Sequence, residues 1–120
     1  MRRDMDLIRG ILLTVGDSDD PVDANVFTDS AHSFELVVYH IDLIRQAGLA
    51  DTNITRAMGG RIIHATVGPL TWEGNEFLDA VRSDTIWGTV KKRVASTVGA
   101  TTLDVVKTLA VRIASDMLMP

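Results

Sequence analysis

The chain has 120 residues, enough for one domain with a real core and too few for two ordinary domains. With 46% hydrophobic and 23% charged residues, its composition excludes a disordered chain, and the absence of cysteine excludes disulfides, zinc-thiolate sites and cysteine nucleophiles. The formal net charge of −4 disfavours, without excluding, a protein whose affinity comes from neutralising phosphates.

The first predicted element is an N-terminal helix that begins after Asp4, a good capping residue, and ends at Gly16. Apolar residues follow the helical period within it: Met5, Ile8, Leu12 and Val15, widened by Leu7 and Ile11. The acidic segment GDSDDPVDAN at 16–25 then indicates an exposed loop, in which Pro21 stands at a position that an EF-hand would use for a ligand. VFTDS at 26–30 predicts a short strand.

The N-terminal segment 1–13 resembles a signal peptide only in its basic start and apolar continuation. Asp4, Asp6 and Arg9 interrupt the apolar run, and no small-residue cleavage site follows it. No apolar run in the chain approaches the roughly 20 residues that a membrane span requires. We therefore expect a cytoplasmic protein with no membrane contact.

A second helix is predicted from Ser33 through FELVVYHIDLIRQAG to Gly48, where a glycine suits a left-handed C-terminal cap. The following stretch, 49–68, has β-branched residues on both sides of the Gly-Gly pair at 59–60. Because Gly-Gly is a recognised two-residue hairpin turn, this stretch predicts a β-hairpin, which Pro69 closes.

Further helices are predicted after the hairpin. Thr71 can cap one over 72–82, and the next runs over 84–98 until Gly99. The last begins near 101–102 and carries an a/d seam of apolar residues. This seam consists of Leu103, Val106, Ala110, Ile113 and Met117. Such a seam either packs onto its own domain or forms a homodimer with a second copy.

The order of helix, helix, β-hairpin and further helices is compatible with a winged-helix arrangement, and also with other small α+β folds. We predict a mainly helical α+β fold that forms a single domain over 1–120. Its winged-helix-like core covers 1–84, with the hairpin as the wing, and a C-terminal helical extension covers 85–120.

Three stretches resemble one family: MRRDMDLIRGILL at 1–13, YHIDLIRQAGL at 39–49 and LTWEGNEFLDAVRSDTIW at 70–87. They are similar to a phage and prophage family known only as a domain of unknown function. The resemblance implies a winged-helix-like fold and an origin in a bacteriophage, or in a bacterium that carries phage genes, but it implies no reaction. The family pattern has histidine where this chain has Asn75, so no metal-binding or base role is carried over to that position.

The last of these stretches is dense in carboxylates, a composition that suits an acid/base site. If a helix begins at Trp72, three of the carboxylates form one stripe along it, namely Glu73, Glu76 and Asp79. Negative charge near a helix start is favoured by the helix dipole, and no nearby residue supplies a nucleophile or a partner base. We therefore interpret the stripe as a solvated helix start, with Trp72 and Trp87 as core anchors, and keep a metal-dependent enzyme as a third hypothesis.

Other catalytic or metal-binding signals are weak. His32, His40 and His64 lack the close spacing of a zinc pair, and the chain has neither a Gly-rich phosphate loop nor a nucleophile elbow. On its predicted helix, His40 falls inside the apolar arc, which favours a hydrogen-bonded core histidine. We expect a non-catalytic protein that uses no metal and no cofactor.

The predicted wing and the second helix bear on whether the partner is nucleic acid or protein. Arg56 and Arg61 lie close to the hairpin turn and should make the wing tip positive, and Arg45 borders the polar face of the second helix. That face carries Glu35, Tyr39, Asp42 and Gln46. Its two acids disfavour contact with phosphates, which carry the same charge. A base-reading helix typically presents Arg, Lys, Asn or Gln instead.

The first hypothesis is a DNA-associated regulatory or accessory factor of a phage or prophage, which contacts duplex DNA through Arg56, Arg61 and Arg45. The alternative is a protein-binding module that docks on a host or phage protein, for example in counter-defence, through the acidic face of the second helix. Either protein would act in the cytoplasm of a bacterial host, and a homodimer through the C-terminal seam stays an open alternative.

Overall fold

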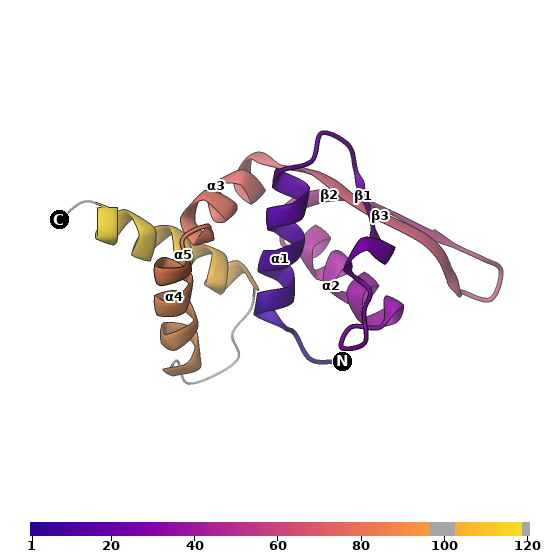
Figure 1. Ribbon diagram of the computed structural model, residues 1–120, viewed down its shortest axis with the longest axis horizontal. Helices are drawn as coiled ribbons and strands as arrows, with labels where there is room; N and C mark the ends of the chain where they lie inside the picture. The colour runs from indigo at the N-terminus through magenta and orange to yellow at the C-terminus, as the bar shows by residue number, and fades with distance from the viewer. Residues whose placement is uncertain (97–102, 119–120) are drawn as a thin grey trace.

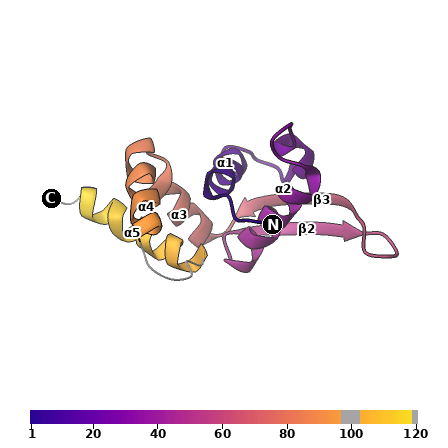
Figure 2. The same ribbon diagram turned by 90° about the horizontal axis from the view of Figure 1, so that it is seen from below.

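The computed structural model describes residues 1–96 and 103–118. In chain order, their elements are α1 (Met5–Gly16), β1 (Val22–Asp23), the 3-10 helix η1 (Ala24–Phe27), α2 (Phe34–Gln46), β2 (Ala50–Arg56), β3 (Ile62–Leu70), α3 (Trp72–Val81), α4 (Asp84–Ser96) and α5 (Leu103–Leu118). The expected mainly helical α+β class is confirmed. α1 lies between α2 with the strands on one side and α3, α4 and α5 on the other (Figure 1 and Figure 2). Across the described helices, none combines the length and the apolar character that a bilayer crossing requires.

Three predicted helix starts are confirmed, two of them with the predicted caps Asp4 and Thr71, and the structure adds Ser33 as the cap of α2. The side-chain oxygens of Asp4, Ser33 and Thr71 each accept a hydrogen bond from the backbone N–H three residues further on, a group that has no partner within the helix itself. α2 also ends as expected, because Gly48 has a φ of +73° and the Leu49 N–H donates back into the last turn of the helix. This left-handed termination leads the chain from α2 directly into β2.

The predicted hairpin is confirmed, but its turn differs from the predicted one. β2 and β3 pair antiparallel, and β3 lies between β2 and β1 in the sheet. The Ala57 N–H donates to the Arg61 carbonyl at 2.7 Å, and the Gly60 N–H donates to the Ala57 carbonyl at 3.0 Å. The predicted two-residue Gly-Gly turn is therefore wrong, because the last bonded pair encloses Met58 and Gly59 as well as Gly60.

Two other local predictions require correction. The strand predicted at 26–30 is wrong, because the strand covers Val22–Asp23 and the chain then turns into η1. The cause is local: a carboxylate oxygen of Asp23 accepts a hydrogen bond from the Asn25 N–H at 2.8 Å, which fixes a turn in place of an extended chain. Pro69 does not close the hairpin, since β3 includes it and ends one residue later.

The C-terminal seam packs inside the chain. Most of it is buried where α5 contacts α3 and α4, while Met117 is 47% exposed. The buried residues are Leu103, Val106, Ala110 and Ile113. Of the two alternatives for the seam, the structure shows packing onto the protein's own helices, so these residues are not available as a dimer seam. α3 also packs against α1, and it thereby joins the sheet-bearing part of the molecule to the last helices. Gly99 and residues 101–102, predicted to end and begin helices, lie outside the described residues.

Candidate functional site

The wing arginines lie in solvent at the outer end of the hairpin. Arg56 and Arg61 are both exposed, at the end of β2 and just before β3, and Figure 1 shows this turn projecting away from the helices. The Arg56 guanidinium donates through Nη1 to the Gly60 carbonyl at 3.2 Å, which ties the side chain to the turn. Met58 at the tip is fully exposed. The hairpin therefore presents two cations beside an apolar side chain to solvent.

Arg45, the third candidate for DNA contact, is engaged within α2. Its Nε donates to Oδ1 of Asp42 at 2.8 Å, and Gln46 Nε2 donates to the other carboxylate oxygen at 2.8 Å. The hydrogen bond from Arg45 is the largest cause that lowers the pKa of Asp42, assisted by Gln46 and by the charges of Arg45 and Arg56. The structure thus joins one DNA-contact candidate and two protein-interface candidates in a cluster whose charge is largely neutralised internally.

The rest of the α2 face is divided between solvent and core. Glu35 is exposed, whereas Tyr39 is half-buried with its ring edge-on to His40 at 5.3 Å between centroids. His40 is fully buried and receives the Asp4 N–H on Nε2 at 2.7 Å, while its Nδ1 lies 2.8 Å from the Leu36 carbonyl. Because an amide N–H only donates and a carbonyl only accepts, the ring is neutral with its proton on Nδ1. The predicted hydrogen-bonded core histidine is confirmed.

The carboxylate stripe of α3 lies on the surface, as expected of a solvated helix start. Glu73, Glu76 and Asp79 are all exposed, and Thr71 caps the helix by accepting the Gly74 N–H at 3.0 Å. Glu73 forms an ion pair with Lys107 of α5 at 2.7 Å. Among the side chains that the structure describes, no group of three or more His, Asp or Glu is arranged to hold a metal ion.

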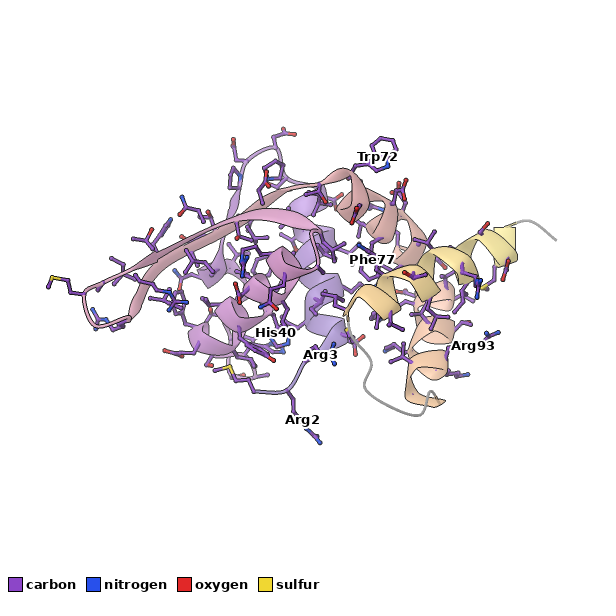
Figure 3. All side chains as sticks on the ribbon, turned by 180° about the vertical axis from the view of Figure 1, so that it is seen from behind. Arg2, Arg3, His40, Trp72, Phe77 and Arg93 are labelled. Atoms are coloured by element: carbon purple, nitrogen blue, oxygen red, sulfur yellow. The ribbon has the colours of Figure 1, made fainter. Side chains whose placement is uncertain are left out.

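The prediction that both tryptophans anchor the segment 70–87 to the core is wrong for Trp72. Trp87 is buried, but Trp72 is 79% exposed and points away from the molecule, whereas Phe77 points inward (Figure 3). The indole Nε1 donates to Glu76 Oε1 at 2.7 Å, so the ring lies along the outside of its own helix. Because an α-helix advances 100° per residue, position 72 stands opposite buried Val81. The helical period therefore indicates the outward position of Trp72, although the size and hydrophobicity of its side chain favoured a buried position.

Two of the family-like stretches meet where α2 ends and α3 begins. The Thr71 N–H donates to the Leu49 carbonyl at 3.0 Å, and the Thr71 hydroxyl donates to the Gly48 carbonyl. Gly74 then lies so close that a Cβ atom there would stand 1.8 Å from the Leu49 carbonyl oxygen. The contact between 39–49 and 70–87 thus involves backbone atoms and the Thr71 hydroxyl, and the close approach at position 74 requires a glycine.

The N-terminal stretch joins the same network through Arg9 of α1. Its guanidinium donates to the Val81 carbonyl at 2.7 Å and to the Arg82 carbonyl at 2.9 Å, which are the last carbonyls of α3 and its C-cap. The same group pairs with Asp84 at the start of α4 at 2.9 Å. Sequence reasoning missed this residue as a contact, because its acceptors lie more than seventy positions away. The three stretches are therefore held together by structural contacts.

Asp6 adds a second link between α1 and α4. Its Oδ1 accepts hydrogen bonds from Trp87 Nε1 at 2.8 Å and from Lys91 Nζ at 3.0 Å. The hydrogen bond from Trp87 is the largest cause that lowers the pKa of Asp6, and it acts with Lys91 against the opposing effect of partial burial.

Acid is expected to weaken this link. A carboxyl group whose pKa is lower in the folded state stabilises the fold above its unfolded pKa of about 4 and loses that contribution as the pH falls through the folded value. The free energy of unfolding should therefore fall more steeply below about pH 4 for the natural protein than for Asp6→Asn. Urea unfolding across this pH range measures the difference, and parallel curves for the two proteins would contradict it.

The comparisons with known proteins identify a family without assigning a reaction. The family model described as "Hypothetical protein (DUF2513)" matches residues 2–101. An uncharacterised protein of Haemophilus influenzae is 35% identical over 120 residues, which cover 98% of this chain and 99% of that protein. No solved structure matches the chain. The chain belongs to the DUF2513 family.

Proposed function

We propose that this protein is a non-catalytic, DNA-associated accessory or regulatory factor of phage or prophage origin with a winged-helix-like fold. Helices α1 and α2 are followed by a β-hairpin, and β1 between the helices pairs with that hairpin in the order β1-β3-β2. This order supports a winged-helix-like arrangement with the hairpin as the wing. The family-like stretches in the sequence support the phage origin.

The observation that carries the proposal is the exposed pair Arg56 and Arg61 at the tip of the projecting hairpin. Exposed guanidinium groups on a projecting hairpin suit contact with phosphates, which supplies affinity but no sequence preference. Asp42 holds Arg45, and Glu35 adds a second acid to the outer face of α2. We therefore propose backbone contact by the wing, without base reading by α2.

The salt dependence of binding tests this proposal. Each phosphate contact contributes about 0.9 to the slope of log Kobs against log salt concentration. Arg56→Ala combined with Arg61→Ala should therefore make this negative slope shallower by about 1.8. Fluorescence anisotropy with labelled duplex DNA measures the slope. Lys92→Ala combined with Arg112→Ala is the matched control, because it removes two exposed cations from α4 and α5, at the far end of the molecule from the wing.

Asp42→Asn supplies a variant that should act in the opposite direction. The substitution removes a negative charge beside the wing and releases Arg45 from its ion pair, so binding at low salt should become tighter. Absence of binding to any duplex at low salt would contradict the proposal. Equal slopes for the natural protein and the wing variant would contradict it as well.

A further inference from the structure

We infer that the outer surface of α3 and α5 is a docking site for a cationic, amphipathic segment of another protein. Its centre is Trp72, whose large apolar ring is 79% exposed on α3. Exposed tryptophans of this kind are the residues most enriched at the energetic centres of protein interfaces. This surface is separate from the wing arginines and does not depend on DNA binding.

A hydrogen bond within α3 orients the Trp72 ring. Its Nε1 donates to Glu76 Oε1 at 2.7 Å, one helical turn further on, so the indole lies along α3 with solvent beside it. A side chain that is already ordered loses little conformational entropy on binding. The ring face can therefore receive a cation from the partner, because a guanidinium or ammonium group is attracted to the π-face of tryptophan.

A groove lies between α3 and α5, and Glu76, the hydrogen-bond partner of Trp72, is part of its lining. It encloses about 340 Å³, and the described residues that line it are Glu73, Glu76, Lys107, Thr108 and Val111. Val111 is 39% exposed and supplies an apolar wall, while the ion pair between Glu73 and Lys107 forms part of the lining. An apolar side chain of a partner can therefore enter beside Val111 while a cation rests on Trp72.

Charge determines which partner fits this surface. Trp72, Glu76 and Asp79 lie on one face of α3 at spacings of four and three residues, and both acids are exposed. In the part of the chain that the structure describes, neither acid forms an ion pair, whereas Asp42 on α2 is paired with Arg45. The uncompensated negative charge selects Arg or Lys side chains and repels nucleic-acid phosphates. We therefore place the proposed protein-binding surface on α3 in place of α2.

A synthetic peptide with repeated Arg-Leu-Leu-Arg units is the probe for this site. NMR of the full chain resolves the indole N–H signals of the two tryptophans, and Trp72→Phe assigns them. The peptide should shift the Trp72 signal and leave that of buried Trp87 in place. Trp72→Ala should weaken binding by about tenfold or more, because it removes both the apolar contact and the π-face. Trp72→Phe should restore part of that loss.

Glu76→Gln and Glu35→Gln form a matched pair of charge variants. Gln at position 76 keeps an oxygen that can accept the Trp72 N–H but removes the charge, so binding should weaken, whereas the same change at exposed Glu35 on α2 should have little effect. Equal binding of a peptide with Glu in place of Arg would overturn the proposal. Binding indifferent to Trp72→Ala would also overturn it, as would a self-association of the protein that Trp72→Ala abolishes, since the occupant would then be a second copy.

Discussion

Gly74→Ala is expected to lower the free energy of unfolding by about 3 kcal/mol, the upper range for forcing an extra methyl group into a packed contact. The added Cβ would lie 1.8 Å from the carbonyl oxygen of Leu49 and 2.8 Å from its carbonyl carbon. Both atoms belong to the backbone, so no side chain can rotate out of the way. α3 must move away from the start of β2, and the hydrogen bond from the Thr71 N–H to Leu49 is then stretched or lost.

Gly10→Ala and Gly88→Ala are the controls for this prediction. Both glycines lie inside helices, α1 and α4, and no heavy atom stands within 4 Å of the position that a Cβ would take. Alanine should therefore stabilise the protein at these positions by about 0.5–1 kcal/mol, because it restricts the unfolded chain and favours the helix. Thermal or urea unfolding of the variants measures the difference in sign. A Gly74→Ala protein as stable as these controls would contradict the close contact between α3 and Leu49.

The elements that the sequence predicted well are those set by local interactions. Asp4, Ser33 and Thr71 each bond to an N–H three residues away, so a short stretch of sequence contains the whole interaction. Gly48 ends α2 for a similarly local reason, its positive φ. The hairpin turn was harder, because strand register decides which residues stand at its centre and register depends on pairing across the whole of β2 and β3.

The candidate site was predictable in part. Exposure of Arg56 and Arg61 follows from their place beside a turn, and the pairing of Asp42 with Arg45 follows from their spacing of three residues on a helix. The outward position of Trp72 also follows from the helical period, but its hydrophobicity favoured the opposite interpretation. Periodicity is the better guide here, because the buried face of α3 already holds Phe77 and needs no second aromatic ring.

The roles of Gly74 and Arg9 were not predictable, because both depend on contacts distant in the sequence. Gly74 is required by Leu49, and Arg9 is required by carbonyls that appear only where α3 ends. Neither residue type by itself indicates such a contact, since glycine is common in turns and arginine is common on surfaces. The family-like stretches therefore include the places where α1, α2 and α3 meet, and these contacts explain Arg9, Thr71 and Gly74.

Arg9→Met is expected to lower the free energy of unfolding by about 3 kcal/mol, which combines lost charge-assisted hydrogen bonds with acceptors left unpaired. The Arg9 side chain is only 15% exposed, and its guanidinium satisfies the Val81 and Arg82 carbonyls where α3 has no further N–H to offer. It also lies 5.8 Å from the centre of the Trp87 ring, a cation–π contact that methionine cannot reproduce.

Two further variants separate the causes of this loss. Asp84 is 95% exposed in its side chain, so Asp84→Asn should cost less than about 0.5 kcal/mol, as expected of a solvent-screened ion pair. Arg9→Lys keeps the charge but lacks the planar fork that reaches both carbonyls, so its stability should fall between those of the natural protein and Arg9→Met. Urea unfolding of the three variants measures this order. If Asp84→Asn cost as much as Arg9→Met, the ion pair between Arg9 and Asp84 would be what holds α1 to the helical end of the molecule. The expected order instead means that the hydrogen bonds from Arg9 to the carbonyls of α3 hold α1 there.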